Sequence, residues 1–160
     1  MSIKVNGVLL SDSVVGYLET ILWAETCMLP VPEEELVDGC MDVDDDHPLH
    51  GISESDPLDA HFGIDDFTVE SLEKAKEEVG DFFDQADDAE LIARAHRFAD
   101  NSRIAHDFWL TRQGHGAGFW DGDYQDDTDN VGDALSELSR KFSEFCNVFV
   151  DEDGCLHIDG

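Results

Sequence analysis

The chain has 160 residues, with 39 Asp and Glu against 9 Lys and Arg and a formal net charge of −30. Hydrophobic residues make up 41% of it, including ten Phe and three Trp, which excludes a wholly disordered acidic tail and allows one domain with a hydrophobic core. The charge also excludes a nucleic-acid-binding protein, because such a chain repels a polyanion. No apolar run approaches the roughly 20 residues that a membrane span needs.

In chain order, the first predicted element is a small hairpin in IKVNGVLL around Asn6-Gly7. Ser11 to Ser13 offer N-cap side chains to a helix predicted over about 13–26. Residues 30–66 show neither the helical nor the strand period, and they contain all four prolines and the run Asp42-Val43-Asp44-Asp45-Asp46. We predict a long acidic irregular insertion over 30–66, of a kind that is usually functional or mobile.

Helical spacing of apolar residues predicts four further helices, over about 69–83, 88–99, 103–112 and 131–146. Thr68, Ser102 and Asn130 are the expected N-caps of three of them. The tail 147–159 alternates apolar and polar residues around Asp153-Gly154, which is the strongest hairpin signal in the chain. The predicted fold is α+β: a mostly helical single domain over 1–160 with a small antiparallel sheet that includes the C-terminal hairpin.

The segment HDFWLTRQGHGAGFWDGDY, from His106 to Tyr124, is the densest in chemically informative residues. One interpretation is a packed corner of the core, in which aromatic rings cover a glycine loop and Arg112 pairs with Asp107 or Asp121. The other is a recognition or catalytic loop, because His and carboxylate groups can act as general acid and base or as metal ligands. The second interpretation is built on His106, Asp107, Arg112, His115 and Asp121. The motif residues singled out as core or recognition residues are Asp107, Trp109, Arg112, His115, Phe119, Trp120 and Asp121.

This motif resembles one that recurs in an uncharacterised family of small proteins of tailed bacteriophages, with the core DFWLTR-x-GHGAGFWD. YLETILWAET and LDAHFGIDDFTVESLEKA are also similar to that family, so the resemblance covers about residues 17–26 and 58–158. The region from Met28 to Pro57 departs from it and looks like an insertion. The resemblance implies a phage origin and a place in the host cytoplasm, but no activity and no catalytic residues.

The sequence matches known cofactor-binding and metal-binding motifs poorly, and we expect neither a cofactor nor a metal ion. The glycines are not followed by the Lys of a phosphate-binding loop. Asp42 would begin a calcium-binding loop, but His47 and Ser53 occupy the positions that require Gly and Glu. The histidines near Cys40 match no zinc-ligand spacing. The N-terminus lacks the pattern of a secretory signal and the four cysteines form no CxxC pair, so we expect reduced thiols in a cytoplasm.

The charge is unevenly spread: residues 1–66 hold sixteen acidic residues and one basic residue, Lys4, and the other eight basic residues lie between Lys74 and Lys141. Solubility needs a net charge of only about 2–8. Halophilic adaptation is one explanation of the excess, but it predicts evenly spread charge. We therefore favour an inhibitor that mimics DNA and binds a basic, nucleic-acid-binding host protein, such as a defence protein, through Glu33, Glu34, Glu35, Asp38, Asp42, Asp44, Asp45, Asp46, Glu54, Asp56, Asp59, Asp84, Asp87 and Asp88. The alternative is an enzyme or metal-dependent protein that uses the loop from His106 to Asp121.

Overall fold

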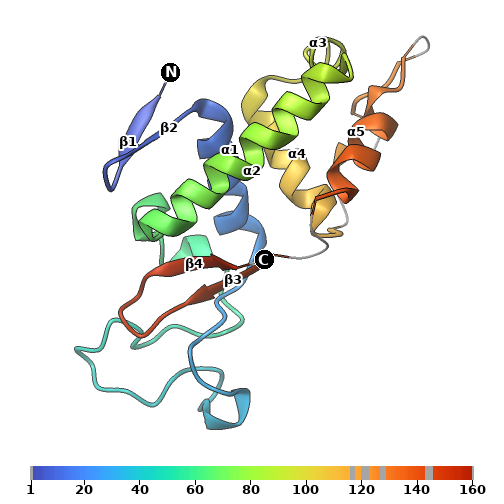
Figure 1. Ribbon diagram of the computed structural model, residues 1–160. Helices are drawn as coiled ribbons and strands as arrows, with labels where there is room; N and C mark the ends of the chain where they lie inside the picture. Colours follow the sequence, from blue (N-terminus) through green and yellow to red (C-terminus); the bar gives the residue numbers. More distant parts are fainter. Residues whose placement is uncertain (1, 116–117, 120–122, 127–128, 143–145, 160) are drawn as a thin grey trace.

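A helical core with a two-stranded hairpin near each end of the chain forms the architecture of the computed structural model (Figure 1). The structure describes residues 2–115, 118–119, 123–126, 129–142 and 146–159. The helices are α1 (Asp12–Ala24), α2 (Val69–Asp88), α3 (Leu91–Ala95), α4 (Asn101–Arg112) and α5 (Val131–Arg140). The strands are β1 (Ile3–Val5), β2 (Val8–Leu10), β3 (Asn147–Val150) and β4 (Leu156–Asp159). The α+β prediction is confirmed. The hairpins form two separate antiparallel sheets, β1-β2 and β3-β4.

The core lies where α1, α2, α4 and α5 meet. α1 packs along α4, and α2 lies across both in Figure 1. Phe82 of α2 stacks on Phe108 of α4, with ring centroids 4.1 Å apart, and Tyr17 of α1 stacks on the same Phe108 at 5.6 Å. All three side chains are fully buried. No helix in the described part of the chain is long and apolar enough to cross a membrane.

Both hairpins form at the predicted turns. In the first, Val5 pairs with Val8, while Asn6 (φ +50°) and Gly7 (φ +83°) take the left-handed conformations that a tight two-residue turn requires. In the second, Val150 pairs with Leu156. The backbone of β4 also contacts Thr68, whose N–H donates to the carbonyl of Leu156 at 3.1 Å. The second hairpin is thereby attached to the start of α2.

Helix boundaries and caps differ from the sequence prediction at four places. α2 continues to Asp88, and Glu90, with φ +61°, then turns the chain into a single-turn α3 where a helix to residue 99 was predicted. α4 is capped by Asp100, whose carboxylate accepts the N–H of Arg103; the predicted cap, Ser102, instead donates its hydroxyl to a carbonyl of α1. The predicted capping bond from Asn130 to α5 is absent from the described contacts. α5 ends at Arg140, where a helix to residue 146 was predicted, and Lys141 and Phe142 are not helical; residues 143–145 lie outside the described residues.

The segment 30–66 is irregular, as predicted, and it is fastened to the rest of the fold. It contains only three short 3-10 helices, at Glu33–Glu35, Leu58–Ala60 and Ile64–Asp66. Leu49, Ile52 and Leu58 bury their side chains in the core, with at most 5% exposed. The N–H of Leu58 donates to the carbonyl of Glu25 at 2.9 Å. Its carboxylates are therefore carried on a chain that is anchored at several points.

Candidate functional site

The glycine-rich motif begins in α4 and turns back onto it. Gly114, with φ +73°, follows the end of the helix in the left-handed conformation that favours glycine. Gly118 lies against Thr111, where an added Cβ would overlap the threonine hydroxyl. That hydroxyl accepts the N–H of Phe119 at 3.0 Å. Because Trp109 and Phe119 are both buried, this part of the motif has the geometry of the packed-corner interpretation.

Asp107 is a buried carboxylate within the motif, with 1% of its surface exposed. The hydroxyl of Tyr124 donates to it at 2.6 Å and Nε of Arg103 at 3.0 Å. Burial raises the pKa of Asp107, and the hydrogen bonds from Tyr124 and Arg103 oppose that rise. The carboxylate thus joins α4 to the chain that follows the motif.

Arg112 does not take Asp107 as its partner, which corrects one of the two predicted pairings. Its Nη1 forms an ion pair with Glu78 of α2 and donates to the hydroxyl of Tyr17 at 3.0 Å. Sequence analysis did not find Glu78 as a partner because it is distant in sequence and only helix packing brings it to Arg112. The second predicted partner, Asp121, lies outside the described residues, as does Trp120. Arg112 is 5% exposed, so this ion pair joins α4 to α2 inside the protein.

His115 contacts a residue that the sequence did not single out. Its Nε2 lies 2.7 Å from a carboxylate oxygen of Glu25, and the indole N–H of Trp109 donates to the same oxygen at 2.9 Å. Glu25 caps the C-terminus of α1. No local pattern could have identified Glu25, because it lies 84 residues from Trp109.

The titratable groups of the motif therefore make three separate sets of contacts in the described structure. Asp107 faces Tyr124, Arg112 faces α2, and His115 faces the end of α1. A catalytic acid and base must reach one substrate together, and this arrangement fastens elements to one another instead. Within the described ranges, no group of three or more His, Cys, Asp or Glu side chains is placed to hold a metal ion.

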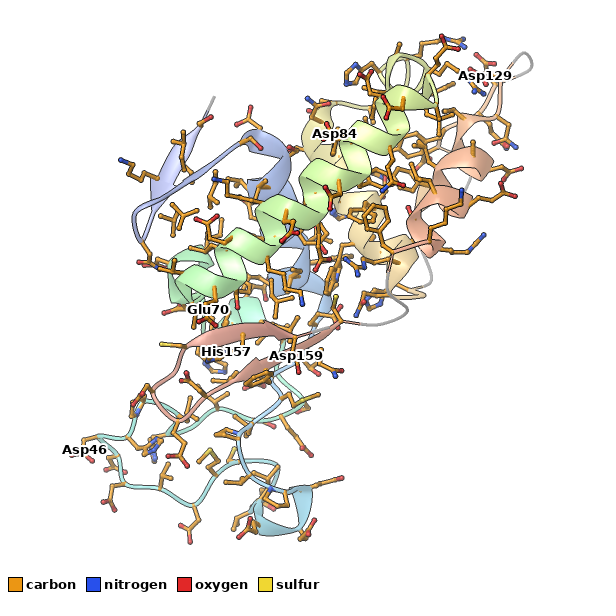
Figure 2. The ribbon with its side chains drawn as sticks, in the orientation of Figure 1. Asp46, Glu70, Asp84, Asp129, His157 and Asp159 are labelled. Atoms are coloured by element: carbon orange, nitrogen blue, oxygen red, sulfur yellow. The ribbon has the colours of Figure 1, made fainter. Side chains whose placement is uncertain are left out.

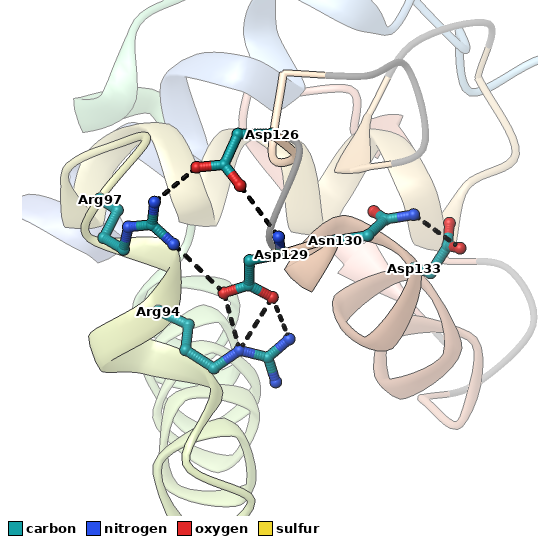
Figure 3. Close-up of polar contacts among 6 residues, drawn as sticks. All are labelled: Arg94, Arg97, Asp126, Asp129, Asn130 and Asp133. Atoms are coloured by element: carbon teal, nitrogen blue, oxygen red, sulfur yellow. Dashed lines mark hydrogen bonds and ion pairs between the residues drawn. The ribbon is translucent and has the colours of Figure 1, made fainter.

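Arginines at the other end of the helical core form ion pairs within the chain. Arg94 forms a two-pronged ion pair with Asp129, and Arg97 contacts both Asp126 and Asp129 (Figure 3). The hydrogen bonds from Arg94 lower the pKa of Asp129. Arg103 likewise holds Asp107 and Asp123. These arginines fasten the chain before α5, so their positive charge is compensated locally.

The predicted partner-binding carboxylates occupy two separate regions. Figure 2 shows Asp46 at the tip of the irregular segment, beyond the β3-β4 hairpin, and Asp84 far from it on α2. Most members of the set are exposed. Glu54 and Asp56 are half-buried, and Asp56 accepts hydrogen bonds from His61 and the N–H of Ser53, which lower its pKa. The structure does not bring the two groups together.

Sequence analysis named Asp84 and Asp88 but missed the row of carboxylates on α2 to which they belong. Its members repeat every three or four residues and all face solvent; we call the six the acidic row: Glu70, Glu73, Glu77, Asp81, Asp84 and Asp88. At 1.5 Å per residue the row is about 27 Å long. An open groove of about 650 Å³ adjoins it, lined by Glu70, Glu73, Glu77, Glu78, Asp81, Lys74, Val69 and Phe142. The helical spacing of acidic residues was the signal that could have found the row.

Comparison with protein-family models, with curated proteins and with solved structures found no match to this chain.

Proposed function

We propose that this protein is a phage-encoded inhibitor that mimics DNA and binds the basic, nucleic-acid-binding surface of a host protein. The observation that carries the proposal is the acidic row. Six exposed carboxylates follow one another along one side of a straight helix, at about one charge per 5 Å of axis. A single strand of duplex DNA carries about one phosphate per 3.4 Å, so a groove that binds phosphates meets a comparable line of charge.

Apart from Glu70 in the first turn, the charges of the acidic row are placed where the helix dipole does not favour them. Asp84 and Asp88 lie toward the C-terminus of α2, where the helix dipole favours cations, and α2 has no basic residue in its last turn. Neighbouring members repel one another at spacings of three and four residues. Proteins keep an arrangement that lowers their stability mainly where that arrangement serves a function. Binding of a basic surface is such a role, and it also accelerates association through electrostatic steering.

The alternative function, an enzyme or metal-dependent protein that works through the loop from His106 to Asp121, has less support. The described motif residues are engaged in contacts between elements, and two of the titratable ones, Asp107 and Arg112, are buried. The phage origin rests on the resemblance of the motif. The preference for a host defence protein follows from that origin.

A pair of charge-matched variants tests the proposal. One replaces the acidic row by amides: E70Q, E73Q, E77Q, D81N, D84N and D88N. The other replaces six exposed carboxylates of the irregular segment: E33Q, E34Q, E35Q, D42N, D44N and D46N. Each removes six of the 39 acidic charges, so a difference between them reports the arrangement of charge and not its total.

The partner is first captured from host lysate at low salt and eluted with duplex DNA, then purified for affinity measurements. We expect affinity to fall steeply between 0.05 and 0.3 M salt, since screening weakens such contacts, and duplex DNA to compete. The row variant should lose more than tenfold in affinity, mainly through slower association, and the matched variant less than threefold. Binding that ignores salt, DNA and both variants would refute the proposal. Equal losses in the two variants would refute the role of the acidic row.

A further inference from the structure

An open cleft of about 500 Å³ lies between α1 and the first turns of α4. The two helices approach closely at Gly16, where an added Cβ would lie 2.8 Å from the carbonyl oxygen of Ser102. The side chains that line the cleft beside this crossing include Glu19, Thr20, Trp23, Asp100, Arg103 and His106. It is separate from the acidic row and from the packed corner of the motif.

Trp23 presents an aromatic surface at the edge of this cleft. It is 61% exposed, although Trp109 is fully buried. The ring of His106 lies against it, with centroids 5.8 Å apart and planes tilted by 33°. Exposed tryptophans contribute strongly to protein interfaces, and their faces attract cations. The indole is therefore suited to hold a flat cationic group.

Hydrogen bonding fixes the proton on one nitrogen of His106. The hydroxyl of Thr20 donates its single hydrogen to the carbonyl of Gly16 at 2.6 Å. The contact between that hydroxyl and Nδ1 of His106, at 2.8 Å, then requires Nδ1–H as the donor. Burial lowers the pKa of His106; the negative charge of Asp107 opposes this shift and the positive charge of Arg103 adds to it. The neutral ring therefore keeps its lone pair on Nε2, which is a hydrogen-bond acceptor.

The charges around the cleft favour a cation. Glu19 and Asp100 each contribute an exposed carboxylate. The guanidinium of Arg103 donates to Asp107 at 3.0 Å and to Asp123 at 3.2 Å, so its charge is compensated outside the cleft. The other groups that line the cleft are the aromatic face of Trp23, the neutral acceptor Nε2 of His106, and the carboxylates of Glu19 and Asp100.

We infer that this cleft binds an arginine side chain of the protein partner. Its planar guanidinium lies on Trp23 and donates N–H groups to Nε2 of His106 and to the carboxylate of Glu19. A lysine ammonium is a compact point charge without a flat face, so arginine is preferred. The partner that supplies the arginine rests on the proposed function, because nucleic-acid-binding surfaces are rich in this residue. The acidic row would thus attract the basic partner, and the cleft would bind one of its arginine side chains.

Three tripeptides with blocked ends test the cleft on the full chain without the partner: Gly-Arg-Gly, Gly-Lys-Gly and Gly-citrulline-Gly. Amide and indole NMR signals are followed during titration at 20 mM salt, and the Trp23 indole is assigned from Trp23→Phe. We expect saturable shifts at Trp23, Glu19 and Ser102 with the arginine peptide, weaker ones with lysine, and none with uncharged citrulline. Equal shifts with citrulline, or shifts confined to the acidic row, would overturn the inference.

Variants then separate the cleft from the general attraction of an acidic protein. Trp23→Ala and Glu19→Gln should each weaken binding of the arginine peptide, and Trp23→Ala should lower its affinity roughly tenfold. The control, Val37→Ala, changes another exposed apolar side chain and should leave the affinity unchanged. Affinity within twofold of the original in both Trp23→Ala and Glu19→Gln would overturn the inference. Trp23→Ala is also measured against the purified partner. If the row variant loses affinity there but Trp23→Ala does not, the cleft inference fails while the proposed function stands.

Discussion

Replacing the acidic row by amides is expected to stabilise the protein while it weakens partner binding. Successive members of the row are three or four residues apart, which gives five neighbouring like-charge pairs. Each such pair destabilises a helix by about 0.2–0.5 kcal/mol, so relief of all five contributes about 1–2.5 kcal/mol to the free energy of unfolding.

The helix dipole adds two smaller contributions of opposite sign. Asp84 and Asp88 lie toward the negative end of α2, and neutralising each contributes about 0.3–1 kcal/mol. Glu70 lies in the first turn, where its charge is favourable, so its replacement costs a similar amount.

Lys74 and Lys76 lie three or four residues from Glu70, Glu73 and Glu77, and the three favourable pairs lost there cost about 0.6–1.5 kcal/mol. We expect a net gain of about 1–2 kcal/mol at low salt. At about 2–4 °C per kcal/mol for a domain of this size, Tm rises by about 2–8 °C.

Urea denaturation and calorimetry at 10 mM and 500 mM salt measure this effect. The gain should shrink at high salt, because the Debye length falls to a few ångströms. The charge-matched variant of the irregular segment removes as much charge but breaks up no long helical row, so its gain should be smaller. A row variant that is less stable than the original protein, or a gain that does not change with salt, would refute the reasoning.

Three other predictions concern the motif and the thiols. Trp109→Ala should lower the free energy of unfolding by about 3–5 kcal/mol in urea denaturation, whereas His115→Ala, which loses one half-exposed hydrogen bond, should cost about 1 kcal/mol; reversal of that order would favour the functional interpretation of the loop. Gly118→Ala should lower Tm in calorimetry, at a cost of about 1–3 kcal/mol, because φ is +143° and the new methyl meets Thr111; an unchanged Tm would contradict the packing there. Burial raises the pKa of Cys27 from 9.0 to about 11, so the unfolded chain loses this proton first and stability should fall as pH rises from 9 to 11; thermal melts of Cys27→Ala should show a shallower fall, and an identical one would contradict it.

Local patterns in the sequence predicted much of the fold. Asn6-Gly7 and Gly154 mark the two hairpin turns, because few other residues adopt left-handed conformations readily. Apolar spacing located α1 and α4 to within two residues and the starts of α2 and α5, but α2 runs five residues beyond its predicted end and α5 stops six residues before its own. Glu90 limited the prediction: its left-handed conformation separates α2 from α3 and is not expected of a glutamate.

The candidate sites were only partly predictable. Acidic composition indicated a basic partner, but the selected carboxylates of the irregular segment and of the end of α2 lie far apart in the structure (Figure 2). The acidic row could have been predicted from the spacing of Glu70 to Asp88, since residues three and four apart share a helix face. The cleft at Trp23 could not, because it forms only where Gly16 meets Ser102 in another helix.

The sequence by itself therefore determined the turns, most of the helices, the irregular segment and the excess of negative charge, because each depends on neighbours along the chain. The tertiary structure alone decided that Arg112 meets Glu78 rather than Asp107, and that Glu25 joins Trp109 to His115. These contacts join residues 34 to 90 positions apart. Their geometry is set by how the helices cross and by which side chains fit between them, and periodicity within one helix carries no information about either.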